Sequence, residues 1–124
     1  NNNRISRQTY YHNDIISNYI EFKYDKKGNL IKRLTFQVSE NGRAQLTNKT
    51  RFEFDNKHNP FKALNNLMLP GKYSNPNNIV KTISANYYLI ENMEDDINTI
   101  ITSFEYNQYS YPVTVDGKMK YIYE

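Results

Sequence analysis

The sequence has no cysteine and no tryptophan, and its 124 residues include only four glycines and four prolines. Without cysteine, disulfides, thiolate metal sites and cysteine-based catalysis are excluded. Four glycines leave little material for loops that cradle phosphate, and no Gly-x-Ser-x-Gly element is present. No apolar run approaches the length of a membrane-spanning helix, and no signal peptide is recognisable. These absences favour a non-enzymatic protein.

Charge of one sign is also scarce, since 16 basic residues stand against 13 acidic ones and give a net charge of +3. Bases and acids are interspersed, as in Glu21-Phe22-Lys23 and Arg51-Phe52-Glu53. No basic stripe of the kind that neutralises phosphates is evident along the chain. Nucleic acid is therefore not an expected partner.

Aromatic residues and asparagine are abundant instead, with twelve tyrosines, six phenylalanines and nineteen asparagines. Aromatic rings bury a large area per residue, whereas asparagine favours turns. This composition predicts a thin, aromatic core, and the length suits a single β domain over residues 1–124. Since the chain begins with Asn1 and not with Met, we expect it to be a processed product or a fragment that lacks an upstream leader or anchor segment.

One pattern occurs three times without gaps, beginning at Phe22, Phe52 and Phe104. It reads Phe, any residue, an aromatic residue, Asp or Asn, three variable residues, Asn or Tyr, and then an apolar residue or proline. The two rings fall on one face of a strand, and the Asp or Asn side chain starts a turn. Asn78-Ile79-Val80-Lys81 also echoes Asn29-Leu30-Ile31-Lys32. The repeats therefore predict a chain of β-hairpins.

Alternating hydrophobicity predicts an all-β fold, an antiparallel meander of about eight strands that is curled into a partial barrel. Asn41-Gly42 and Asp116-Gly117 are strong hairpin turn signals. The expected strands are Arg4–His12, Tyr19–Asp25, Leu30–Val38, Leu46–Asp55, Ile79–Ile90, Asn98–Asn107, Tyr111–Val115 and Lys118–Tyr123. An immunoglobulin-like sandwich of two packed sheets is the alternative.

Phe61, Leu64 and Met68 have helical spacing, which predicts a short helix or apolar plug over Phe61–Leu69 at one open end of the sheet. A set of large apolar residues is expected to be mostly buried. It consists of Phe22, Tyr24, Leu34, Phe36, Phe52, Phe54, Leu64, Leu67, Ile83, Phe104 and Tyr106.

The segment Tyr24-Asp25-Lys26-Lys27-Gly28-Asn29-Leu30 resembles the YD repeat, a tyrosine–aspartate hairpin unit of large bacterial shell and surface proteins. Phe54-Asp55-Asn56-Lys57-His58-Asn59-Pro60-Phe61-Lys62 is similar to the "YDxxxNPF" element of a family of uncharacterised bacterial lipoproteins. In that family a Leu-rich stretch, an "NN-V/I-x-K" strand and a terminal "YxxxGYP" hairpin follow. Their counterparts here are Leu64 to Leu69, Asn77 to Lys81, and Tyr106 to Pro112, with Ser110 in place of the usual Gly.

This resemblance covers the chain from about Tyr19 to its end. It implies an exported protein of the bacterial cell envelope, often lipid-anchored, whose antiparallel sheet curls toward an open, porin-like barrel. A membrane partner is implied only through such an anchor. The repeated element is structural, so the resemblance implies no activity and no cofactor.

The residue types that bind metals show no ligand spacing. His12 and His58 are the only histidines, and no His-x-x-x-His arrangement is present, so turn or surface histidines are expected. The acidic cluster Glu91, Glu94, Asp95 and Asp96 is predicted to be a solvated hairpin tip, with a loose calcium site as the alternative. No metal and no cofactor are therefore expected.

Tyrosines supply the candidate ligand-binding residues. Tyr10-Tyr11 and Tyr87-Tyr88 are adjacent pairs, so each pair sends one ring to either face of the sheet. Exposed tyrosine beside asparagine suits a glycan or an extended peptide, and cross-strand aromatic pairing is the alternative role. The candidates are Tyr11, Tyr87, Tyr88 and Tyr109.

The expected function is that of a non-enzymatic binding or scaffold module, exported to the bacterial envelope or secreted. A carbohydrate-binding module is one alternative. A glycoside hydrolase is another, and it would need two carboxylates across a cleft.

Overall fold

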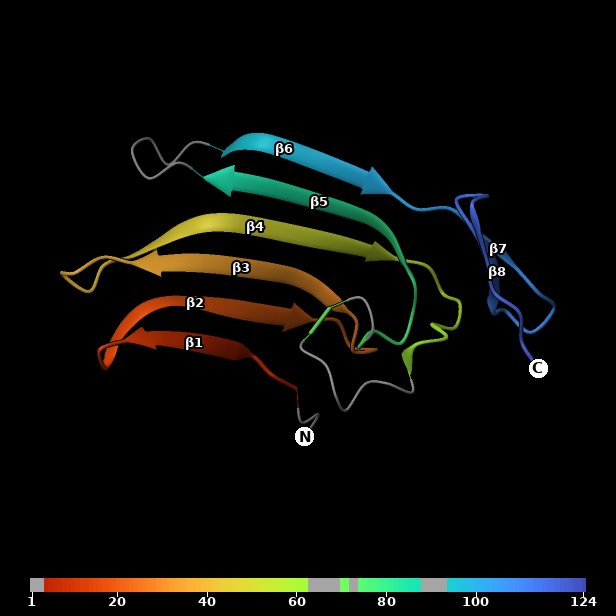
Figure 1. Ribbon diagram of the computed structural model, residues 1–124, viewed down its shortest axis with the longest axis horizontal. Coiled ribbons are helices and arrows are strands. Elements are labelled where there is room, and N and C mark those ends of the chain that lie inside the picture. Colours follow the sequence, from red (N-terminus) through yellow and green to blue (C-terminus); the bar gives the residue numbers. More distant parts are fainter. Residues whose placement is uncertain (1–3, 63–69, 72–73, 88–93) are drawn as a thin grey trace.

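The computed structural model describes residues 4–62, 70–71, 74–87 and 94–124, and within them it contains nine strands and no helix. Strands β1 to β6 pair in sequence order as one antiparallel sheet, and β7 to β9 form a second (Figure 1). The strands are β1 (Arg7–His12), β2 (Ile15–Tyr24), β3 (Leu30–Val38), β4 (Ala44–Phe54), β5 (Ile79–Tyr87), β6 (Glu94–Ile101), β7 (Phe104–Tyr106), β8 (Pro112–Val115) and β9 (Met119–Lys120). The predicted all-β class and antiparallel meander are confirmed.

The six-stranded sheet is open, because β1 and β6 form its two edges and do not pair with each other. Its ribbons bend along their length, as a partial curl requires (Figure 1). The three-stranded sheet lies at the end of this sheet where β6 finishes (Figure 1). Most of the plug predicted over Phe61–Leu69, residues 63–69, lies outside the described residues.

The predicted strand Asn98–Asn107 is in fact two strands, which belong to different sheets. The backbone N–H of Ser103 donates to the Asp116 carboxylate at 2.7 Å, and the N–H of Asp116 donates to the Ser103 carbonyl at 2.9 Å. These bonds replace ladder hydrogen bonds at the point where the chain crosses over. Alternation alone does not reveal such a transfer, since apolar residues stand on both sides of it.

The first hairpin turn also differs from expectation, because β2 begins at Ile15 directly after the turn. Asn13 and Asp14 have φ of 49° and 61°, and His12 pairs with Ile15. Two central residues at positive φ are the mark of a type I′ turn, and asparagine and aspartate tolerate that conformation better than most residues.

The three copies of the repeated pattern form turns of one geometry. Each turn follows a register shift, after which Tyr24 pairs with Leu30, Phe54 with Ile79 and Tyr106 with Pro112. The Asp or Asn directly after the strand, called here the strand-ending residue, then donates its N–H to the carbonyl of the residue that closes the turn. These bonds join Asp25 to Asn29 at 2.9 Å, Asp55 to Asn78 at 3.1 Å and Asn107 to Tyr111 at 2.9 Å.

In each turn the side chain of the strand-ending residue also accepts the returning N–H. The three distances, in chain order, are 2.8, 3.1 and 3.1 Å. Gly28 and Ser110 occupy the same place in their turns, at φ of 96° and 64°. In the second copy, residues 59–77 are inserted before the turn closes on Asn78, which explains why Asn78 resembles Asn29 in sequence.

The fully buried apolar side chains are few. Among residues with described burial they are Phe22, Leu30, Pro112 and Ala85. The buried polar residues are Asn29, Thr50, Asn59, Asn75, Asn78 and Thr114. The expected aromatic core is therefore replaced in large part by asparagine and threonine.

Of the residues predicted to be interior, Phe22 is buried at 4% exposure and the other described ones are half-buried. Leu64 and Leu67 lie outside the described residues. The register explains the difference. Phe52 pairs with Thr82 while Arg51 pairs with Ile83, so Phe52 and Ile83 point to opposite faces of the sheet. The described apolar residues of the sheet are thus divided between its two faces and do not gather on one of them.

Phe22 offers a direct test of where the apolar core lies. We expect Phe22→Ala to lower the free energy of unfolding by about 3–5 kcal/mol, because it empties a fully enclosed site. Phe54→Ala removes the same atoms from a half-buried site and should cost clearly less. Urea unfolding of both variants measures the difference, and equal losses would contradict this assignment of the core.

A candidate binding cavity between the two sheets

The first and second of the repeated turns are linked to each other by asparagine side chains. Asn29 donates from Nδ2 to the Asp25 carboxylate and to Oδ1 of Asn77, both at 3.0 Å. The N–H of Asn77 returns a bond to Asn29 at 3.1 Å, and its Nδ2 donates to the Lys57 carbonyl at 2.8 Å. Asn77 thereby joins the first turn to the second.

Asn75 makes a second bridge between the same turns. Its Oδ1 accepts the N–H of Leu30 at 2.7 Å, and its carbonyl accepts Nδ2 of Asn59 at 2.8 Å. Its own Nδ2 donates to the Gly71 carbonyl at 2.7 Å. Asn75 is only 1% exposed. Its side-chain oxygen, its side-chain nitrogen and its carbonyl oxygen each have a hydrogen-bond partner, as is usual for buried polar groups.

The second turn is joined in turn to the third. The Tyr106 hydroxyl donates to the Asp55 carboxylate, which also accepts Nδ2 of Asn78 at 3.1 Å. The N–H of His58 donates to the Ser110 carbonyl at 3.1 Å. Burial, and then the bond to Asp55, raise the pKa of Tyr106, so the phenol stays protonated and remains the donor. These bonds connect the two sheets.

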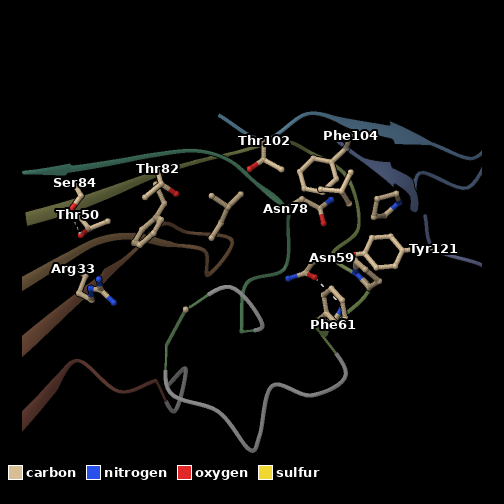
Figure 2. Close-up of a pocket in the computed structure, with 16 residues that line it drawn as sticks. Arg33, Thr50, Asn59, Phe61, Asn78, Thr82, Ser84, Thr102, Phe104 and Tyr121 are labelled. Atoms are coloured by element: carbon tan, nitrogen blue, oxygen red, sulfur yellow. Dashed lines mark hydrogen bonds between the residues drawn. The ribbon is translucent and has the colours of Figure 1, made fainter. Parts of the chain in front are cut away.

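A cavity of about 410 Å³ lies where the linked turns bring the two sheets together (Figure 2). Its walls come from β3, β4 and β5, from the connection between β4 and β5, and from β7, β8 and the chain after β9. The lining residues are Arg33, Thr50, Phe52, Asn59, Pro60, Phe61, Gly71, Asn78, Ile79, Thr82, Ser84, Thr102, Phe104, Pro112, Val115 and Tyr121.

The sheet side of the cavity is a hydrogen-bonded polar surface. The Thr50 hydroxyl donates to Asn48 at 2.9 Å and lies 3.3 Å from the Ser84 hydroxyl, which accepts Nδ2 of Asn48 at 3.1 Å. Arg33 is the cross-strand neighbour of Thr50, and an exposed guanidinium therefore stands beside the hydroxyls. Register places these groups on one face, because directly paired residues share a face.

The remaining walls combine aromatic rings with aliphatic and amide side chains. Phe52 comes from β4 and Phe104 from β7, while Phe61 and Tyr121 meet edge to face with ring centroids 5.8 Å apart. Figure 2 shows Phe61, Phe104 and Tyr121 grouped toward the three-stranded sheet, with Thr82, Ser84 and Arg33 at the other end. Phe52 is the cross-strand partner of Thr82 and therefore belongs to that other end. The cavity thus has one largely aromatic end and one polar end, an arrangement that suits a ligand with both kinds of surface.

The tyrosines predicted from the sequence do not gather in one place. Tyr11 is 64% exposed on β1 next to its hairpin turn, and Tyr87 is half-buried at the end of β5. Three strands separate β1 from β5, which amounts to roughly 19 Å across the sheet. Tyr109, 69% exposed, lies in the turn between β7 and β8 of the other sheet. Tyr88 lies outside the described residues.

Alternation along β4 and β5 was the signal that could have revealed the cavity. Thr50 shares a parity with Phe52, and Thr82 shares one with Ser84, so each strand presents one face rich in hydroxyls or rings. The sequence interpretation placed the interior on the Ile83 face of β5, and the hydroxyl face consequently went unrecognised. The register between β4 and β5 is what joins the two faces into one surface.

The two histidines lie in different parts of the fold. His12 is exposed at the end of β1, and the ring of His58 stacks on Tyr111 with centroids 5.0 Å apart. No cluster of three or more histidine or acidic side chains suited to a metal occurs among the described residues. The side chains of the acidic cluster at Glu91 and Glu94–Asp96 lie outside the described set.

Comparisons with protein-family models, with curated proteins and with solved structures find no match to this chain. Among the described residues, no helix has the length and apolar character needed to cross a membrane.

The link between the turns is testable at Asn29, which is 1% exposed. We expect Asn29→Ala to lower the free energy of unfolding by about 1–3 kcal/mol, because buried partners such as the Asn77 N–H lose their acceptor. Asn98→Ala, at an exposed position of β6, is the matched control and should have little effect. Thermal or urea unfolding compares the two, and an equal response would show that the amide network contributes little.

The Asp25 carboxylate makes the stability dependent on pH. Burial acts to raise its pKa, but hydrogen bonds from Asn29, Gly28 and Lys27 outweigh it and hold the pKa below its ordinary value of 3.8. Stability from ionised Asp25 is therefore fully present above pH 3.8 and is lost as the pH falls through the lowered pKa. Urea unfolding at a series of pH values should show Asp25→Asn to be less stable at neutral pH, with a gap that narrows in acid. If the difference in stability between Asp25→Asn and the unaltered protein did not change with pH, the effect of the substitution would not come from ionisation of Asp25.

Proposed function

We propose that the protein is a non-enzymatic binding module and that the cavity between its sheets holds a short glycan. The observation that carries the proposal is the cavity itself, in which aromatic rings face a surface of hydroxyl and amide groups. Its volume of about 410 Å³ falls within the range of ordinary small-molecule sites.

A sugar matches both ends of the cavity. The apolar faces of pyranose rings stack on aromatic side chains, which Phe61, Phe104 and Tyr121 supply. Sugar hydroxyls both donate and accept, as do the hydroxyls of Thr82 and Ser84 opposite them. Arg33 adds donors only, so it favours a sugar that presents an acceptor or an acidic substituent at the polar end.

The described lining favours binding over hydrolysis. Glycoside cleavage uses two carboxylates placed on either side of the scissile bond. The described groups around this cavity are rings, hydroxyls, amides, aliphatic side chains and one guanidinium. They can hold and orient a sugar but offer no group to protonate its leaving oxygen. Export to the bacterial envelope is supported by the resemblance to the lipoprotein family and is part of the proposal.

Thr82 provides the test of the cavity. A glycan array should first identify a sugar that binds the unaltered protein, and calorimetry with that sugar then gives its affinity. We expect Thr82→Val to weaken binding about tenfold, because it removes one hydroxyl partner while keeping the shape. The matched control is Thr99→Val, which makes the same change at an exposed position of β6, on the opposite face of the sheet.

Two results would contradict the proposal. One is the absence of any glycan ligand from a folded protein on the array. The other is a glycan whose affinity is unchanged by Thr82→Val and is lost with Tyr11→Ala, Tyr87→Ala or Tyr109→Ala. The second result would move the site to one of the tyrosines predicted from the sequence.

A further inference from the structure

The face of the large sheet opposite the cavity carries a row of cations. Lys23 on β2 pairs with Lys32 on β3, and Lys32 pairs with Arg51 on β4. Directly paired residues share a face, so three basic side chains stand side by side across three strands. Their neighbours Phe22, Arg33 and Thr50 form the adjacent row and point to the cavity side.

Further cations extend this row into a patch. Lys49 lies two residues before Arg51 on β4, Lys81 lies two residues before Ile83 on β5, and Arg7 pairs with Glu21. The cationic face, as we define it, consists of Arg7, Lys23, Lys32, Lys49, Arg51 and Lys81. Among the described residues, the carboxylates Glu21 and Glu53 lie on the same face, because Glu21 pairs with Arg7 and Glu53 pairs with Lys81.

These two carboxylates are already engaged with cations at the margins of the patch. Lys81 lies 3.2 Å from Glu53, and Lys23 lies 4.0 Å from Glu21. Within the described residues, no salt bridge reaches Lys32, Lys49 or Arg51. The centre of the face is therefore an uncompensated positive charge that spans β3 and β4.

Like charges placed directly opposite each other destabilise a sheet. A sheet that only needs solubility can alternate charges across strands, as this one does where Lys81 faces Glu53. Three adjacent cations instead create a concentrated positive field that attracts an anionic partner. Binding to another molecule therefore explains this row of cations better than the stability of the sheet does.

We propose that the cationic face binds a membrane surface that contains anionic lipids. Four of its six members are lysines, whose ammonium groups are point charges on flexible stems and can meet headgroups in many arrangements. Ile101 pairs with Lys81 at the rim of the same face and is 71% exposed. An exposed apolar side chain beside lysines is suited to enter the headgroup region while the cations hold the surface.

The aromatic residues of this face argue against single-stranded nucleic acid as the partner. Single-stranded nucleic acid binds on free aromatic rings on which bases stack. The Tyr19 and Phe36 rings instead stack on each other at 4.7 Å, and the Arg7 guanidinium covers Tyr19 at 3.7 Å. These rings are occupied within the sheet, so the face presents its cations together with the exposed β6 side chains Ile97 and Ile101.

Binding to vesicles tests the proposal. The probes are vesicles of phosphatidylcholine alone and vesicles in which about a third of the lipid is phosphatidylglycerol, each used in a sedimentation assay at low and high salt. We expect binding only to the anionic vesicles, and weaker binding at high salt. Each cation near an anionic bilayer contributes about fivefold in affinity, so Lys32→Glu should lower binding by more than fivefold.

The thermal stability of Lys32→Glu shows whether a loss of vesicle binding comes from unfolding. A carboxylate at residue 32 would stand between Lys23 and Arg51 and relieve their repulsion, so the melting temperature of Lys32→Glu should rise. Lys118→Glu changes the net charge equally in the exposed turn between β8 and β9 and should bind vesicles as before. Ile101→Ser should weaken the binding that remains at high salt.

Other outcomes would overturn the proposal. Equal loss of binding with Lys118→Glu would show that only net charge matters, and equal binding to phosphatidylcholine alone would remove the role of the cations. Binding to heparin or duplex DNA with higher affinity than to anionic vesicles, lost with Lys32→Glu, would assign the face to a soluble polyanion. Since the cavity lies on the other face, none of these results bears on glycan binding.

Discussion

The capture of a returning backbone N–H by the aspartate or asparagine that ends a strand is the interaction on which the structure rests. It occurs at Asp25, Asp55 and Asn107, each time after a register shift. Few apolar side chains are buried among the residues whose burial is described, so that part of the fold draws less than usual from hydrophobic burial. Satisfied polar groups at the turns define where each strand stops and how the next one starts.

The same turns position the functional surfaces. Asn75 and Asn77 connect the first turn to the second, and Tyr106 connects the second to the third, so the two sheets meet at a fixed place and enclose the cavity. The register that the turns impose also decides which side chains share a face. Thr50 and Phe52 of β4 are sorted to the cavity side and Lys49 and Arg51 to the other, although they alternate along the strand.

Local patterns in the sequence were sufficient for the fold class, for most strands and for the repeated turns. Gly28-Asn29 and Asp116-Gly117 encode their conformations within a few residues. The cavity could not be predicted in this way, because it depends on Thr50 of β4 lying beside Arg33 of β3 and near Ser84 of β5. Likewise Lys23, Lys32 and Arg51 are scattered in sequence, and only the pairing of three strands makes them a row.

The order of strands in the large sheet has a consequence for how the chain reaches its native state. Every strand from β1 to β5 pairs with its immediate successor, so each new contact closes a loop between neighbours in the chain. Contacts of this kind are fast to form, and they require no segment that has yet to emerge. Hairpins can therefore be added one after another from the N-terminal end, as in a chain that folds while it is being delivered from a ribosome or a translocation pore. The connection between β4 and β5 interrupts this progression, so closure of the turn between Asp55 and Asn78 is the step at which folding should pause.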